Sequence, residues 1–188
     1  HRDLLSFPTR RSSDLSLYFC NGKEWKRFYG NENITYGKLE DERDGQIYRT
    51  VEIGNQTWMA ENLNYYDKTN LSLKGKSWCY DNDSLKCSEY GRLYTWAAAI
   101  DSVAIAADKN NPQNCGYGKK CDFSEKIQGI CPNAWHLPNN DEWNKLFSAV
   151  GGESTAGIAL KSQNKWEYHY GCIGSDSYGF SAFPASRK

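Results

Sequence analysis

Residues 44–65 of the chain read DGQIYRTVEIGNQTWMAENLNY. The pair Asp44-Gly45 is a turn signal, and the residues after it alternate between two faces as in a β-strand. Ile47, Val51 and Ile53 share one face, and Tyr48, Thr50 and Glu52 share the other. Gly54-Asn55 then predicts a two-residue hairpin loop, after which residues 56–59 return as a second strand. In that register Val51 lies opposite Trp58, a pairing that stabilises antiparallel strands.

A helix is predicted over residues 140–150. Asn139 is a good N-cap residue, and Glu142 three residues later completes a capping-box pattern. One apolar stripe follows at helical spacing, made of Trp143, Leu146, Phe147 and Val150. Gly151-Gly152 ends the helix. Shorter helices are expected after Ser154 and from Thr95 to about Asp101, and residues 102–129 read as a loop.

Aromatic residues are abundant, with 7 Trp, 13 Tyr and 7 Phe beside 16 Gly. Large rigid rings supply much buried area per residue, which suits a small β-rich extracellular domain. We expect a buried core in which the following residues are in mutual contact: Trp58, Trp96, Trp135, Trp143, Leu146, Phe147 and Val150.

Seven cysteines in a chain of 188 residues indicate an oxidising compartment. Cys79 with Cys87 and Cys115 with Cys121 are close in sequence, and each pair is predicted to form a local disulfide. In the chain-entropy model loops this short contribute about 2.5 kcal/mol each. A four-cysteine zinc site and free thiols are the alternatives, but zinc favours tighter CxxC-like pairs.

Charge and hydropathy exclude two classes of partner. The 23 basic and 23 acidic residues balance, so the chain has no electrostatic footprint for nucleic acid or an anionic membrane. No apolar run approaches the roughly 18 residues that a transmembrane helix needs. No motif in the chain implies a metal or a cofactor.

The first forty residues differ from the rest. Residues 1–15 have no apolar period and resemble the translation of a sequencing adapter, so we treat them as a non-native scar. Residues 16–30 predict a hairpin around Asn21-Gly22, in which Cys20 has no local partner. We interpret residues 16–40 as the tail of an upstream hairpin module followed by a linker at 31–40.

Several longer motifs follow one another in a fixed order. Residues 44–65 come first, then Cys79-Tyr80, residues 90–96 (YGRLYTW) and residues 115–118 (CGYG). Residues 129–138 (GICPNAWHLP), Glu142-Trp143 and residues 178–182 (YGFSA) complete the series. In this order they resemble the Fibrobacter succinogenes major paralogous domain, over residues 41–188.

The resemblance implies a C-type-lectin-like α+β fold. Leu137-Pro138 followed by Glu142-Trp143 is also similar to an element of formylglycine-generating-type domains, which have that fold. We therefore expect two or three short helices against small irregular antiparallel sheets, in a loop-rich, disulfide-containing domain.

The resemblance further implies that the domain is incomplete at its C-terminus. The family's late cysteine, the expected partner of Cys131, is missing, and Cys172 is a possible substitute. Phe180 and Phe183 are then expected to be more exposed than rings normally are.

We predict a non-catalytic secreted or cell-surface interaction module, which binds extracellular polysaccharide or a surface protein. The candidate ligand-binding residues combine rings that stack on sugars with amides and carboxylates that bond hydroxyls: Tyr65, Tyr66, Tyr80, Asn62, Asn64, Asp81 and Asn82. The expected location is extracellular or the outer cell surface.

Two alternatives have specific requirements. A formylglycine-generating-type oxidoreductase needs a redox-active cysteine pair late in the domain, in the region that this chain lacks. A calcium-dependent lectin needs converging oxygens, for which residues 81–83 and 139–141 are candidates. His136 is interpreted as a packed structural histidine and His169 as a solvated loop residue, and no catalytic triad pattern appears.

Overall fold

The computed structural model describes residues 18–20, 25–27, 34–115, 118–123, 126–164, 166 and 174–184. Its central feature is an antiparallel sheet of β3 (Tyr36–Asp41), β4 (Gln46–Ile53) and β5 (Gln56–Met59), in that order. The predicted hairpin register is confirmed, because Val51 pairs with Trp58 across the Gly54-Asn55 loop. Gly54 has a φ of 63°, a conformation that favours glycine at this turn.

The buried face of β4 changes from one side of the sheet to the other along the strand. Tyr48 and Thr50 are buried in its first part, and Val51 and Ile53 are buried in its second part. Ile47 shares a face with Val51 but is 61% exposed, since the core covers that face only toward the end of the strand. The strand therefore contributes to packing on both sides of the sheet.

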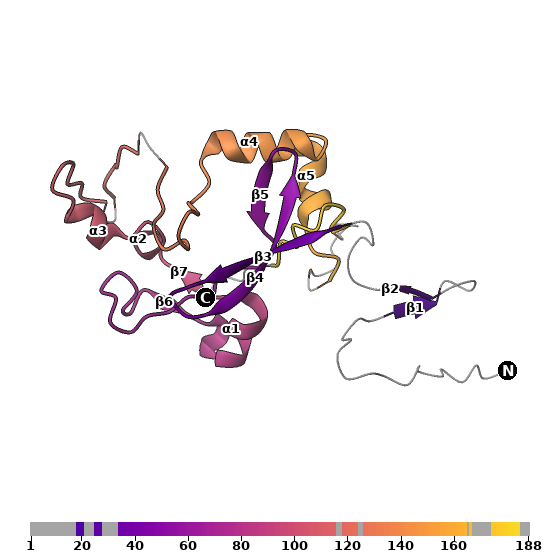
Figure 1. Ribbon diagram of the computed structural model, residues 1–188, viewed down its shortest axis with the longest axis horizontal. Coiled ribbons are helices and arrows are strands. Elements are labelled where there is room, and N and C mark those ends of the chain that lie inside the picture. The colour runs from indigo at the N-terminus through magenta and orange to yellow at the C-terminus, as the bar shows by residue number, and fades with distance from the viewer. Residues whose placement is uncertain are drawn as a thin grey trace.

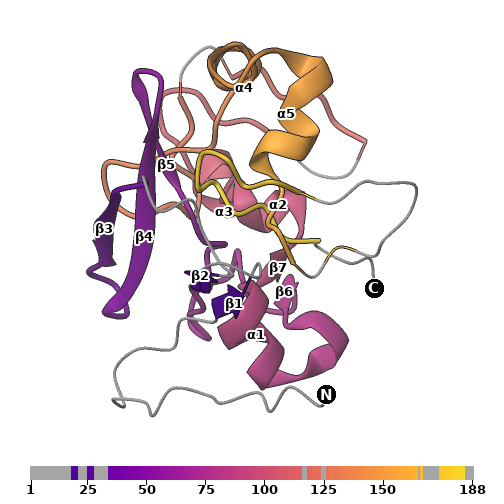
Figure 2. The ribbon, with the colours of Figure 1, turned by 90° about the vertical axis from the view of Figure 1, so that its right-hand side faces the viewer.

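The main hydrophobic core lies between the β4–β5 hairpin and two helices, α4 (Asn140–Ala149) and α5 (Glu153–Leu160). Val51 and Ile53 pack there with Leu146, Val150 and Leu160. The predicted capping box is present, with the Asn139 side chain accepting from the Glu142 backbone and the Glu142 side chain accepting from the Asn139 backbone. Figures 1 and 2 show α4 and α5 near the tip of the hairpin, at the end of the sheet opposite α1.

A second, smaller core cluster consists of Tyr65, Leu73, Ala98 and Ile130. It lies beside a two-stranded sheet of β6 (Ser77–Trp78) and β7 (Leu93–Tyr94). The helix expected from residue 95 to about 101 is present as the shorter α2 (Trp96–Ala99). A further helix, α3 (Ser102–Ala106), lies in the segment predicted as a loop, so that prediction is wrong at residues 102–106. The prediction of a buried Trp96 is also wrong. Its ring is 63% exposed, because α2 buries Ala98 on its inner side.

Both predicted disulfides are formed. Cys79 and Cys87 have Cα atoms 5.0 Å apart, and they join the start of a 3-10 turn, η1 (Tyr80–Asn82), to α1 (Ser84–Tyr90). Cys115 and Cys121 have Cα atoms 5.4 Å apart and close a loop. The chain is thus a loop-rich α+β fold with two disulfides.

Two strands pair upstream of the main sheet, β1 (Tyr18–Cys20) and β2 (Trp25–Arg27), with Cys20 opposite Trp25. This agrees with the predicted hairpin. The linker assigned to 31–40 needs correction, because residues 36–40 belong to β3 and pair with β4. Within the described residues, no helix has the length and apolar character to cross a membrane. Residues 1–15 lie outside the described part of the chain.

Candidate ligand-binding cavity

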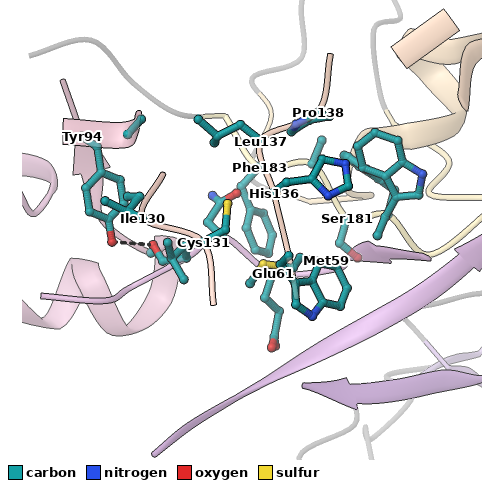
Figure 3. Close-up of a pocket in the computed structure, with 18 of the residues that line it drawn as sticks. Met59, Glu61, Tyr94, Ile130, Cys131, His136, Leu137, Pro138, Ser181 and Phe183 are labelled. Atoms are coloured by element: carbon teal, nitrogen blue, oxygen red, sulfur yellow. Dashed lines mark hydrogen bonds between the residues drawn. The ribbon is translucent and has the colours of Figure 1, made fainter. Parts of the chain in front are cut away.

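A large cavity opens between the β4–β5 hairpin and three other parts of the chain. Its walls come from the residues around η1, α1 and β7, from the segment 126–138, and from the segment 180–184. Its volume is about 1520 Å³, above the roughly 300–1,000 Å³ that is usual for a small-molecule site. Figure 3 shows Met59, His136, Cys131 and Phe183 around this space. The size suits an extended ligand better than a compact metabolite.

Aromatic rings form much of the lining, in two groups. Trp58, Trp143 and Phe180 make one group, with ring centroids 5.0 Å apart for the two tryptophans and 5.7 and 6.2 Å from each of them to Phe180. Tyr90 makes the second group, with centroids 6.4 Å from Tyr80 and 6.1 Å from Phe183. Trp135 and Trp166 line the cavity as well.

The segment that carries Phe180 and Phe183 is fixed by hydrogen bonds. Ala182 forms a parallel bridge to Lys161, and its amide donates to the Leu160 carbonyl. The buried Asp176 carboxylate accepts from the Ser181 backbone at 2.8 Å and from the Ser181 hydroxyl at 2.7 Å. Phe180 and Phe183 are consequently half-buried rather than unusually exposed, which corrects the expectation for these rings.

A charged cluster occupies the wall at the start of α4. His136 Nε2 and Lys126 Nζ each lie 2.8 Å from Glu142 Oε1. Glu142 Oε2 accepts from the Asn139 backbone at 3.0 Å. Burial alone would raise the pKa of the Glu142 carboxyl, but the hydrogen bonds from Lys126, the Asn139 backbone and His136 outweigh burial and lower it to about 2. The carboxylate therefore stays ionised and holds the Lys126 and His136 side chains in place.

A second charged cluster holds the middle of the segment 126–138, at Ile130. The Asp41 carboxylate, which is fully buried, accepts two side-chain hydrogen bonds from Arg43, at 2.8 and 2.6 Å. Burial of Asp41 favours a higher pKa, yet the bonds from Arg43 prevail and lower it. Arg43 also donates to the Ile130 carbonyl at 3.0 Å and lies 3.8 Å above the Tyr65 ring. These contacts fix the backbone next to Cys131.

Cys131 lines the cavity and is a free thiol. Burial raises the pKa of this thiol to about 11, although the nearby Arg43 acts in the opposite direction. At neutral pH the group is thus protonated and a weak nucleophile. Cys172, the substitute partner expected for Cys131, lies outside the described residues.

The structure separates the candidate ligand-binding residues into three environments. Asn62 and Tyr80 line the cavity. Tyr66 is exposed beneath the Arg92 guanidinium, while Asp81 and Asn82 are exposed in η1. Tyr65 is only 8% exposed and belongs to the second core cluster, and Asn64 is partly buried with its backbone bonded to the Tyr48 hydroxyl. The set therefore does not form one continuous site.

Sequence reasoning assigned other lining residues to the core or to structural roles. Trp135 was expected in the core and His136 was interpreted as a packed histidine, yet both line the cavity. The sequence feature that could have marked both residues as part of a site is their place in the motif 129–138. Among the described residues, no three His, Cys, Asp or Glu side chains converge in a group that could hold a metal ion.

The fold and the cavity define a small, disulfide-containing α+β domain with an aromatic-lined cavity. Residues 51–188 match the Fibrobacter succinogenes major domain. The match covers well over half of the chain, so this chain belongs to that family. It begins within β4 rather than at residue 41. No curated protein and no solved structure matches the chain.

Proposed function

We propose that this chain is a non-catalytic interaction module that binds extracellular polysaccharide in the aromatic cavity. The observation that carries the proposal is the combination of half-buried aromatic rings with amide and charged side chains around one open space of about 1520 Å³. The CH groups on one face of a sugar ring pack on aromatic rings, and the hydroxyls bond to polar groups at the edge of the rings.

The polar partners are distributed around the rings. Asn62, Gln56 and Asn55 line the cavity from the hairpin side, with Glu61 beside them. The Asn62 amide already donates to the Tyr90 carbonyl at 2.8 Å, which holds the amide at the edge of the second aromatic group. A pre-positioned amide loses little freedom when a sugar hydroxyl binds it.

The non-catalytic part of the proposal rests on the two reactive groups of the cavity. The Cys131 thiol has a raised pKa, which disfavours the thiolate that an oxidoreductase would use. His136 bonds through Nε2 to Glu142, a carboxylate that also caps α4 and pairs with Lys126. The His136 side chain is thus engaged in holding the cavity wall. Two disulfides support a location outside the cytoplasm.

Binding to a panel of soluble cell-wall polysaccharides, measured by affinity electrophoresis and calorimetry, tests the proposal. Trp135→Ala is the informative variant, because Trp135 lines the cavity and belongs to neither core cluster. We expect it to weaken binding by about tenfold or more. Trp96→Ala is the matched control, since Trp96 is exposed and does not line the cavity. Equal loss in both variants, or no polysaccharide bound by the parent, would contradict the proposal.

A further inference from the structure

The charged side chains that line the cavity differ in whether they have a partner of opposite charge. Glu61 is paired with Arg49 at 2.9 Å, and Glu142 is paired with Lys126 and His136. Arg92 and Lys161 line the same cavity, and neither has a carboxylate partner among the described residues. Once the internal pairs are set aside, the described lining residues therefore carry positive charge without a partner, although the whole chain has a formal net charge of zero.

Arg92 is the more informative of the two cations. Its Nε is buried and has no hydrogen-bond acceptor. A buried donor without an acceptor costs free energy, and the cost is larger when the group is charged. The guanidinium lies 4.4 Å from the centre of the Tyr66 ring, so a cation–π contact holds one of its faces. No carboxylate among the described residues pairs with the guanidinium, so we take its terminal N–H groups, and not the buried Nε, as the donors for a ligand.

The geometry of a guanidinium selects its partner. Arginine presents donors in a planar fork that matches the two oxygens of a carboxylate, and such bidentate pairs are among the stronger hydrogen bonds in proteins. Lys161 offers a second cation in the same cavity, held 4.7 Å from the Trp166 ring. A ligand with repeated carboxylates offers a counter-charge to both cations, whereas a neutral sugar offers none to either.

We infer that the cavity is selective for acidic glycans of the uronic-acid class, with a sugar carboxylate bound by Arg92. This inference rests on the proposed polysaccharide binding and specifies its ligand. Lys161 contributes a second carboxylate contact further along the cavity. Aromatic rings such as Trp135 pack on the sugar faces and do not discriminate charge.

An oligogalacturonate and its fully methyl-esterified form test the inference, because the two probes differ in carboxylate charge on the same sugar backbone. Binding of each to the full chain is measured by calorimetry at low and moderate salt. We expect the acid to bind about tenfold to a hundredfold more tightly than the ester, which is the range for hydrogen bonds to charged groups. Its affinity should fall as salt rises, since charge pairing is screened.

Three variants locate the effect. Arg92→Gln should remove most of the preference for the acid, with Lys161 supplying what is left. Arg92→Lys should retain more of the preference, because lysine keeps the charge without the fork. Lys38→Gln is the matched control, as Lys38 is exposed on β3 outside the cavity, and it should keep the full preference. The affinities of the unmodified chain for the acid and for the ester can be compared without any variant. This comparison tests the selectivity for uronic acids even if Arg92→Gln fails to fold.

The outcomes separate the two levels of the proposal. Equal binding of acid and ester by the parent would overturn the uronic-acid inference and leave polysaccharide binding in place. A preference for the acid that is undiminished in a folded Arg92→Gln variant would overturn the assignment to Arg92. Binding of neither probe, together with no binding to neutral polysaccharides, would overturn the proposed function itself.

Discussion

The Glu142 carboxylate joins three parts of the cavity wall, so replacing it with glutamine is an informative perturbation. Glutamine preserves the size of the side chain and can still accept the hydrogen bond from the Asn139 backbone at the start of α4. What it removes is the negative charge that attracts Lys126 and His136, each 2.8 Å away. The variant therefore isolates the electrostatic contribution of the cluster.

The magnitude follows from the pKa of the carboxyl. The pKa of Glu142 is about 2, against about 4.3 in an unfolded chain, and each unit corresponds to 1.36 kcal/mol, which gives an upper bound of about 3 kcal/mol. Glu142 is 13% exposed but Lys126 is 61% exposed, so solvent screens part of the attraction. We expect Glu142→Gln to lower the free energy of unfolding at pH 7 by about 1–2 kcal/mol.

The pH dependence gives a sharper test than the value at pH 7. Because the folded pKa is depressed, the stabilisation is fully present well above about pH 4.3 and is lost as the pH falls through about 2. Urea unfolding of the parent and the variant from pH 7 to pH 3 should show their difference shrinking by about half. Asp141→Asn, which removes an exposed charge from the same helical turn, is the control. A difference between parent and Glu142→Gln that stays constant over this range would refute the reasoning.

Two further predictions concern packing. Trp143→Ala should lower the free energy of unfolding by about 3–5 kcal/mol, because the Trp143 ring contacts three other rings of the core. Trp96→Ala, the control, should change it by less than about 0.5 kcal/mol. Equal effects of the two substitutions in thermal melts would contradict this prediction. Gly129→Ala should cost about 2–4 kcal/mol, since its φ is 54° and a Cβ would overlap a backbone carbonyl of α2. Gly75→Ala, with a φ of 69° and open space around it, should cost clearly less, and a similar loss in both would show that the overlap is relieved.

The features that the sequence predicted correctly depend on neighbouring residues. The loop at Gly54-Asn55 sets the hairpin register, and the spacing of Asn139 and Glu142 sets the start of α4. The two disulfides close loops of eight and six residues. In each case the interacting groups are a few residues apart, so short-range rules apply.

The features that the sequence did not predict depend on contacts between distant segments. Residues 36–41 contain a glycine and several charges, and they form β3 because β4 offers an unpaired edge. Tyr65 is buried because Arg43, twenty-two residues earlier, covers its ring. Trp96 is exposed because α2 presents its small residues to the core. Periodicity and motif order do not reveal which of several aromatic residues is covered.

The charges of the cavity have two different roles, and the structure separates them by their partners. Arg43 and Glu142 contact the segment 126–138 at different points, through the Ile130 carbonyl and through Lys126. This segment has no helix or strand before α4 begins, so these charged contacts replace regular secondary structure in holding the wall. Arg92 makes no contact of that kind, and its buried Nε is left without an acceptor. The wall-holding charges are thus paired internally, whereas Arg92 has no carboxylate partner among the described residues, and this contrast is the basis for proposing an anionic ligand.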